Sequence, residues 1–273
     1  MYYKEELGFV YPKRSDEHMI TVKHVHDTNF DENYNYLDKT FFYKIKRVLL
    51  NIGLHIILYP FLYFKYGLRI YGRKQFKKNK HLYKNGAITI CNHVFMLDYC
   101  CILKAIRPNL QYLLAWKTNL EGSNAGFIRL VGGIPIPNDN IRAMVKFKQA
   151  VDEVLSTGKW LHVFPEGSMW FYYPAIRPLK PAVFKLAVNH NKPIIPLTIS
   201  FRPRKGLFKL YKKRPCVDLH IGDPLLPDLS LDKKDAIDKM HKDAYHIMQV
   251  MNGITPGHPA YRVDQNIDNY KKI

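Results

Sequence analysis

The chain has 273 residues, of which 42 are Lys or Arg and 23 are Asp or Glu, so its formal net charge is +19 with His neutral. Hydrophobic residues make up 47% and aromatic residues 14% of the sequence, which excludes an intrinsically disordered protein because this much apolar side chain can form a core. The sequence shows no collagen period, Gly/Ser linker or solenoid repeat, so we expect a globular fold. The positive net charge predicts an anionic partner.

The four cysteines are too few and too clustered for a disulfide framework, and none forms a C-x-x-C pair; they are Cys91, Cys100, Cys101 and Cys216. We therefore expect reduced thiols in a cytosolic compartment. The first 18 residues contain no apolar stretch of the kind found in signal peptides, so a cleavable signal is not expected.

The charges are unevenly distributed along the chain. Residues 41–97 contain eleven Lys or Arg and no acid, and residues 167–217 again contain eleven Lys or Arg and no acid. Acidic residues gather mainly before residue 40 and after residue 216. These two stretches, whose charged residues are all Lys or Arg, predict a single positive face built from two parts of the chain.

A polar N-terminal arm precedes the most apolar segment of the chain. Residues 1–38 are weakly periodic and predict an extended or poorly ordered arm, whereas residues 48–64 carry no formal charge. These 17 residues fall short of the roughly 20 that a spanning helix needs, and basic residues flank them on both sides. Because Pro60 is expected to break the helix in two, we predict a monotopic membrane anchor, with a buried core hairpin as the alternative.

Short apolar strands alternate with helices from residue 86 onward. The predicted strands are residues 87–91, 111–116, 160–164, 193–201 and 217–221, and the predicted helices are residues 97–106, 126–131, 141–156, 180–189 and 232–251. This alternation predicts an α/β fold, with a mixed, mostly parallel sheet flanked by helices. We divide the chain into a polar arm (1–40), a basic and aromatic membrane-associating helical segment (41–80) and an α/β domain (81–273).

The segment Asn92–Asp98, directly after the first of these strands, is the first candidate for chemistry. If His93 lies in the turn and Asp98 in the first helical turn, the carboxylate can hold one imidazole nitrogen while the other takes a proton from an alcohol. No protein nucleophile is then needed, because the substrate hydroxyl attacks directly. On its own this spacing is weak, and a structural loop histidine beside a helix N-terminal charge is the alternative.

The second candidate is the segment Phe164–Ser168, which follows the strand at 160–164. Open α/β sheets bind their ligands at the carboxyl ends of the strands. Glu166 is the only acid between Glu153 and Asp218, and we expect it to be pinned by a Lys, an Arg or a substrate hydroxyl rather than solvated in a polar turn.

Four segments in this order, NHVFMLD (92–98), GGIPIP (132–137), FPEGS (164–168) and KPIIPLTISF (192–201), resemble the motif blocks of the glycerolipid acyltransferases. That family includes the 1-acyl-glycerol-3-phosphate acyltransferases, and the resemblance covers roughly residues 86–200. It implies that His93 is the general base on the acceptor hydroxyl and that Asp98 orients it. It also implies acyl transfer from acyl-CoA or acyl-carrier protein to lysophosphatidic acid, giving phosphatidic acid, with no metal or redox cofactor.

The same resemblance implicates a set of substrate-binding residues: Asn92, Lys117, Arg142, Glu166, Gly167, Ser168, Arg177 and Lys180. The chain departs from the family pattern in acceptor recognition. Asn138 stands where the second block usually ends in a phosphate-binding Arg, and Arg142 or Arg129 is expected to substitute for it. The Arg that often follows Pro-Glu-Gly is also missing, and Arg177 is expected to replace it.

Other functions match parts of the sequence. The net charge suits nucleic acid, but no RNA-recognition, zinc-finger or helix-turn-helix signature is present, so we expect no nucleic-acid partner. A metal site at Cys91, His93 and Asp98 lacks a second pair with zinc-like spacing. The remaining alternatives are an acyltransferase for another lysophospholipid or for glycerol-3-phosphate, a hydrolase that uses water on the same His/Asp pair, and a non-catalytic lipid-binding protein. The expected partners are an anionic membrane surface, a lysophospholipid and the thioester donor, at the cytoplasmic face of the cell membrane.

Overall fold

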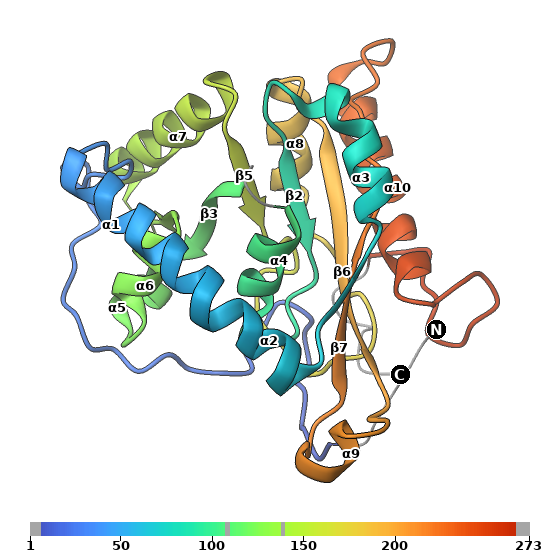
Figure 1. Ribbon diagram of the computed structural model, residues 1–273. Coiled ribbons are helices and arrows are strands. Elements are labelled where there is room, and N and C mark those ends of the chain that lie inside the picture. The colour runs from blue at the N-terminus through green and yellow to red at the C-terminus, as the bar shows by residue number, and fades with distance from the viewer. Residues whose placement is uncertain (1–6, 107–109, 138–139, 266–273) are drawn as a thin grey trace.

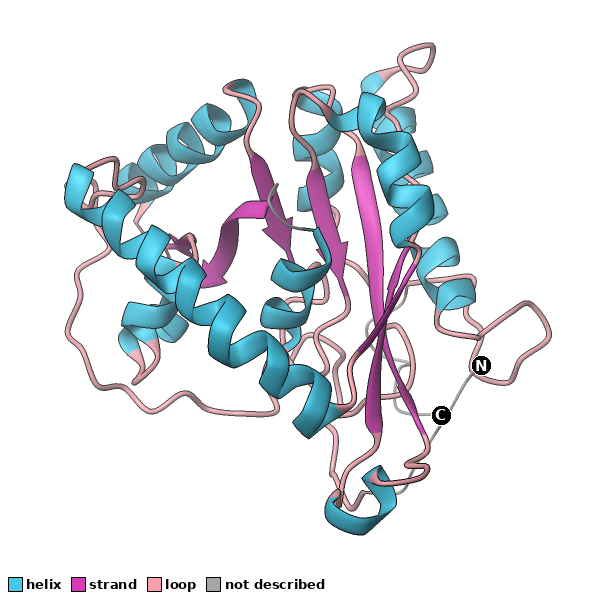
Figure 2. Cartoon of the chain, viewed as in Figure 1, coloured by secondary structure: helices cyan, strands magenta, loops and turns pink. Residues whose placement is uncertain are grey.

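The computed structural model describes residues 7–106, 110–137 and 140–265 (Figures 1 and 2). Seven strands form one sheet in the order β1-β7-β6-β2-β5-β3-β4, in which only the β6–β7 pair is antiparallel. The strands are β1 Arg69–Tyr71, β2 Ile88–Cys91, β3 Leu110–Trp116, β4 Gly133–Ile136, β5 Trp160–Val163, β6 Ile194–Arg202 and β7 Cys216–Ile221. The predicted fold class, a mixed and mostly parallel sheet flanked by helices, is confirmed.

Helices cover both faces of the sheet, as Figure 1 shows. They are α1 Phe41–Gly53, the π-helix η1 Leu54–Leu58, α2 Tyr59–Tyr66, α3 Arg73–Lys78, the 3-10 helix η2 Asn79–Tyr83, α4 Asp98–Ile106, α5 Lys117–Glu121, α6 Ala125–Leu130, α7 Ile141–Ser156, α8 Ala182–Asn189, α9 Phe208–Tyr211 and α10 Lys233–Met251. Successive side chains of a strand point to opposite faces, so the residues of β2 divide between two cores. Cys91 joins the core under η1, α2 and α4, whereas Ile88 and Ile90 join the core under α7, α8 and α10.

Two edge strands differ from the sequence-based expectation. The GGIPIP segment, which is not among the predicted strands, contains β4 at one edge of the sheet, and the three-residue β1, also not predicted, lies at the other edge. Pro135 lacks an amide hydrogen, which the position of β4 at the sheet edge tolerates. Gly132, directly before β4, has a φ of +99°, and an added Cβ would lie 2.1 Å from the Gln111 carbonyl oxygen, so only glycine fits.

The predicted break at Pro60 is wrong. α1, η1 and α2 form one continuous helix, Phe41–Tyr66, that is long and apolar enough to cross a membrane by length and composition. The backbone N–H of Tyr59 donates to the carbonyl of Leu54, five residues back, as in a π-helix. This wider turn accommodates the proline ring and its missing N–H without ending the helix.

The helix Phe41–Tyr66 is strongly two-sided. Tyr59 and Leu62 are 1% and 0% exposed because they pack on the domain, whereas the outer side carries a row of side chains that are at least half exposed. That row consists of Phe41, Phe42, Val48, Leu49, Ile52, Ile56, Ile57 and Phe64.

Candidate active site

The two predicted motif segments meet at one end of the sheet. β2 and β5 are parallel neighbours, so the loops that follow them, 92–97 and 164–168, leave the sheet side by side. The backbone N–H of Trp170 donates to the carbonyl of His93 at 2.9 Å, which ties the second loop to the first. This is the carboxyl end of the strands, where open α/β sheets bind ligands.

His93 and Asp98 lie together in the geometry that the sequence predicts. The His93 Nδ1 is 2.5 Å from Asp98 Oδ2, and the other carboxylate oxygen accepts a hydrogen bond from the backbone N–H of Tyr99 at 2.6 Å. Asp98 is the first residue of α4 and is buried, so the helix N-terminus favours its charge.

The imidazole of His93 is held on its other side by Phe164. The two rings are stacked, with centroids 4.0 Å apart and an interplanar angle of 14°. The His93 side chain is 23% exposed, and its Nε2 has no hydrogen-bond partner within the described part of the chain. This nitrogen is therefore placed to accept a proton from a hydroxyl that approaches from the solvent side.

A buried ion pair supports the His93 turn from below. Glu166 and Arg177 are both buried, and Glu166 Oε2 lies 2.7 Å from Arg177 Nη2. The same carboxylate accepts hydrogen bonds from the backbone N–H groups of His93 at 3.0 Å and Arg177 at 2.8 Å. The guanidinium also donates to Ser168 Oγ at 2.7 Å.

Four of the predicted substrate-binding residues are buried. Glu166, Ser168 and Arg177 are at most 2% exposed, and their polar groups are directed at one another, so they hold the loops in place below the surface. Asn92 is buried as well, and its side chain both donates to the carbonyl of Ile199 (2.9 Å) and accepts from the backbone N–H of Ile199 (2.7 Å). It fixes the end of β2 to β6.

Lys180 and Lys117 are the predicted basic residues that lie next to these loops with accessible side chains. The Lys180 side chain is 43% exposed, and its Nζ lies 3.9 Å from an Asp16 oxygen and 5.7 Å from the centre of the Trp116 ring. Lys117 directly follows Trp116, whose indole N–H donates to the carbonyl of Gly167 at 2.6 Å. Gly167 has a φ of +79°, and an added Cβ would lie 2.8 Å from Lys180 Cε, so glycine is required in this turn.

The structure does not bring the predicted phosphate-binding arginines to these loops. Arg142 is 84% exposed on α7, where it pairs with Glu32 at 3.6 Å. Arg129 donates to the carbonyls of Tyr36 (2.9 Å) and Gly133 (3.0 Å), so its guanidinium serves the fold. Asn138 lies outside the described residues.

The N-terminal arm forms a wall of the site that sequence reasoning missed. Residues 7–40 contain no helix or strand, yet the carbonyl of Ser15 accepts from Arg177 Nη1 at 2.6 Å, and the carbonyl of Glu17 accepts from the Trp170 indole at 2.9 Å. The ring of Tyr11 stacks on Trp170 at 5.5 Å. Because the arm uses mainly backbone carbonyls and aromatic faces, no motif in the sequence reveals it.

His18 brings a further titratable group to this wall. Its ring meets Trp116 edge to face, with centroids 6.3 Å apart. Burial, together with the nearby charges of Lys180, His93 and Arg177, lowers the pKa of His18 below its ordinary value. His18 therefore favours the neutral form next to the candidate base.

His162 lies in the core directly behind Phe164. Its Nδ1 is 2.8 Å from the Thr89 hydroxyl, and its ring meets Phe164 edge to face with centroids 4.4 Å apart. Burial lowers the pKa of His162 to about 3, so the ring is neutral at physiological pH. It supports the phenyl ring on which His93 stacks.

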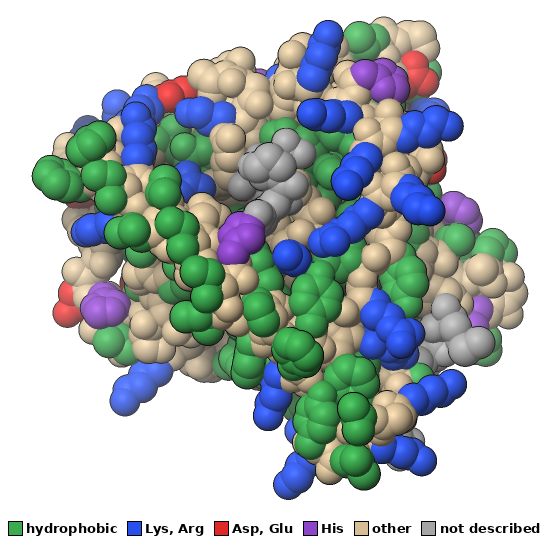
Figure 3. All heavy atoms as spheres, viewed as in Figure 1, with side chains coloured by type: hydrophobic (Ala, Val, Ile, Leu, Met, Phe, Trp, Pro, Cys, Tyr) green, Lys and Arg blue, Asp and Glu red, His purple; other side chains and the backbone are tan. Residues whose placement is uncertain are grey.

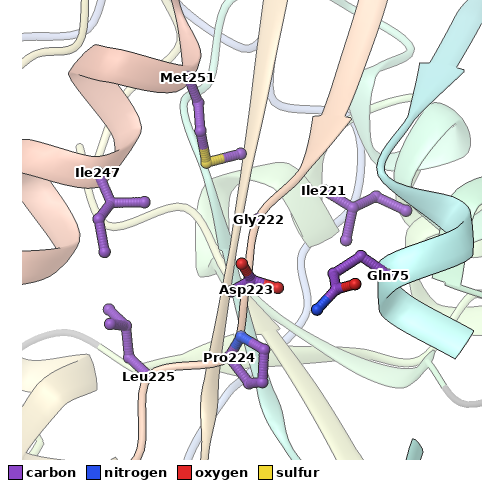
Figure 4. A pocket seen from close by; sticks show the side chains of 8 residues that line it. All are labelled: Gln75, Ile221, Gly222, Asp223, Pro224, Leu225, Ile247 and Met251. Carbon is purple, nitrogen blue, oxygen red and sulfur yellow. The ribbon is translucent and has the colours of Figure 1, made fainter. Parts of the chain in front are cut away.

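Two cavities lie near the sheet. A small one of about 190 Å³ runs beside Ser15, Asp16 and Lys180, between the arm and the loop before α8. A larger one of about 350 Å³ lies at the opposite end of the sheet, among α3, the end of β7 and α10 (Figure 4). It contains none of the candidate residues. In the described ranges, no three His, Cys, Asp or Glu residues gather closely enough to hold a metal ion.

The family described as Acyltransferase matches residues 68–200. A crystal structure of the 1-acyl-sn-glycerophosphate (LPA) acyltransferase PlsC from Thermotoga maritima is similar with a TM-score of 0.49 and 18% sequence identity, over 78% of this chain and 85% of that chain. A search of curated proteins gave no match.

Proposed function

We propose that the protein transfers a fatty acyl group from a thioester to the hydroxyl of a glycerol-phosphate lipid, because residues 68–200 match the Acyltransferase family. Lysophosphatidic acid is the proposed acceptor and phosphatidic acid the product, with acyl-CoA or acyl-carrier protein as the donor. The observation that carries this proposal is the His93–Asp98 pair, in which the carboxylate fixes Nδ1 and leaves Nε2 facing a half-open site.

The proposed reaction has one transfer step without an acyl-enzyme. Nε2 of His93 removes the proton from the acceptor hydroxyl while the hydroxyl oxygen attacks the thioester carbonyl carbon. Asp98 stabilises the imidazolium that forms. The tetrahedral intermediate then collapses, the C–S bond breaks, and the leaving thiolate takes the proton back from the imidazolium. Backbone N–H groups of the motif loops or the Lys117 ammonium stabilise the oxyanion.

Lys180 is the proposed contact for the acceptor phosphate. Its ammonium is accessible beside Gly167, and the weak contact with Asp16 at 3.9 Å leaves it able to bind an anion. Glu166, Ser168 and Arg177 are buried and hold the loop in place. We therefore assign recognition of the acceptor phosphate to the accessible lysines. No metal or redox cofactor takes part in this proposal.

The proposed location is the cytoplasmic face of the cell membrane. The helix Phe41–Tyr66 packs one side on the domain, which favours a position in the plane of one leaflet over a span. The basic stretches then attract anionic headgroups, at about 1 kcal/mol for each Lys or Arg near the surface.

A thioester-release assay on anionic vesicles tests the reaction, with acyl-CoA or acyl-carrier protein as donor and lysophosphatidic acid, glycerol-3-phosphate or no acceptor. We expect acceptor-dependent release that falls at least 100-fold in His93→Ala, since general base catalysis contributes roughly 10²–10⁴-fold. His81→Ala, an exposed histidine on η2, is the matched control and should retain activity.

Two outcomes would contradict the proposal. Release that ignores the acceptor would make the protein a thioesterase that uses water on the same pair. Binding to vesicles without consumption of either donor would favour a lipid-binding protein without catalysis.

A further inference from the structure

The loop between β6 and β7 carries a second exposed apolar group, separate from the helix Phe41–Tyr66. Leu207, Leu210 and Tyr211 on and beside α9 are 74%, 82% and 52% exposed. Their spacing of three and four residues places them on one side of the helical turn. Figure 3 shows a hydrophobic group at the bottom of the view, where Figure 1 labels α9, at the end of the hydrophobic row that runs along α1 and α2.

This loop is also strongly basic. Residues 202–214 contain seven Lys or Arg and no acid. Lys205, Lys209 and Lys213 are exposed around the apolar group. An exposed apolar group ringed by cations complements a lipid leaflet with an anionic surface, because the acyl region takes the leucines and the headgroups take the lysines.

Hydrogen bonds join the loop to the end of α2. The Tyr211 hydroxyl donates to the carbonyl of Phe64 at 2.5 Å, and the Lys212 ammonium donates to the carbonyl of Lys65 at 3.0 Å. These carbonyls belong to the last turn of α2, which lacks helical partners for them. Phe64 itself is 75% exposed, so the apolar row of the helix continues into the apolar group of the loop.

We propose that the β6–β7 loop inserts Leu207, Leu210 and Tyr211 into the same anionic leaflet as the helix Phe41–Tyr66. The membrane then holds the protein at two elements that are far apart in sequence, with Lys205, Lys209 and Lys213 in the headgroup layer. Two membrane contacts fix the orientation of the domain on the bilayer. With a single in-plane helix, the domain could rotate about the helix axis. This inference rests on the proposed membrane location and does not depend on the reaction.

An environment-sensitive fluorophore at Leu210→Cys tests the insertion directly. All four native cysteines are buried, so the introduced thiol is the accessible one. We expect a blue shift of the emission with equimolar phosphatidylcholine–phosphatidylglycerol vesicles. The same fluorophore at Leu229→Cys should show no shift, because Leu229 is 69% exposed in the loop beyond the far end of β7.

A binding measurement with unlabelled protein supports the same test. The double variant Leu207→Ser, Leu210→Ser should partition onto these vesicles on the order of 100-fold more weakly, since burial of each of the two leucines strengthens binding by about tenfold. The matched control is Leu226→Ser, Leu229→Ser, which removes two exposed leucines at the other end of β7 and should bind as the wild type does.

Either of two results would overturn the inference. An unshifted fluorophore at position 210 on vesicles that do bind the protein would show that the loop stays in water. A blue shift without vesicles that grows with protein concentration would show that a second copy of the chain covers the loop. Neither readout needs turnover, so a labelled loop that inserts into the membrane in a protein without transferase activity would reject only the reaction.

Discussion

Arg177 is fully buried, whereas the side chain of Lys180, three residues later, is 43% exposed. We expect Arg177→Met to lower the free energy of unfolding by about 3–5 kcal/mol, because it leaves the Glu166 carboxylate buried without its partner. Lys180→Met should change that free energy by less than about 0.5 kcal/mol and instead raise KM for the phosphorylated acceptor. Urea unfolding and acceptor titration measure the two effects. An Arg177→Met protein of wild-type stability would show that the buried Glu166–Arg177 pair does not stabilise the fold.

His162 predicts a dependence of stability on pH. Burial lowers its pKa in the folded protein to about 3, against about 6.5 in the unfolded chain, so between these values the unfolded chain binds the extra proton. The contribution of the neutral His162 to the free energy of unfolding is therefore fully present above pH 6.5 and is lost as the pH falls below that value. At pH 5 this loss amounts to about 2 kcal/mol.

The variant His162→Gln, which does not titrate, isolates this contribution. Between pH 7.5 and pH 5, the free energy of unfolding should fall by about 2 kcal/mol more in the wild type than in His162→Gln. Urea unfolding at the two pH values measures the difference. Equal losses in both proteins would show that His162 is already protonated, or exposed to water, in the folded state.

The N-terminal arm is the element that completes the site. Removal of residues 1–20 takes away the Ser15 carbonyl that accepts from Arg177 and the Glu17 carbonyl that accepts from the Trp170 indole. It also exposes Trp170, which is 1% exposed in the full chain. We expect acyl transfer to fall at least tenfold, because Arg177 and Glu166 together hold the His93 turn. Vesicle binding should be retained, since the helix Phe41–Tyr66 is unchanged.

The variant Ser15→Ala is the control for this truncation. The Ser15 contacts at Arg177 and Ser168 use its backbone carbonyl, which alanine keeps, so activity should stay near the wild-type value. A truncated protein with full activity would show that the arm only covers the domain.

Across the whole molecule, the features predicted from the sequence are those that local patterns determine. The central strands and long helices were predicted because their apolar periodicity is local, and α7 was predicted from its first residue to its last. The His93–Asp98 contact was predicted for the same reason, since five residues across one strand-to-helix turn determine it.

Long-range partners explain the rest. Edge strands β1 and β4 were missed because pairing with β7 and β3, not their own pattern, makes them strands. The contact between Arg177 and the Ser15 carbonyl was not predicted because the two residues lie 162 positions apart in sequence. The continuity of the helix at Pro60 depends on a π-type bond that no propensity scale describes.

The distance of 162 residues between Ser15 and Arg177 also sets an order of events during translation. At synthesis rates of about 5–20 residues per second, the arm leaves the ribosome roughly 10–30 s before its binding partner is made. No nascent chain that ends before residue 177 has a complete candidate site, so the site forms only after about two thirds of the chain has been made. The polar composition of the arm is compatible with this delay, because a polar segment stays hydrated in the unfolded state until the segment that contains Arg177 has folded.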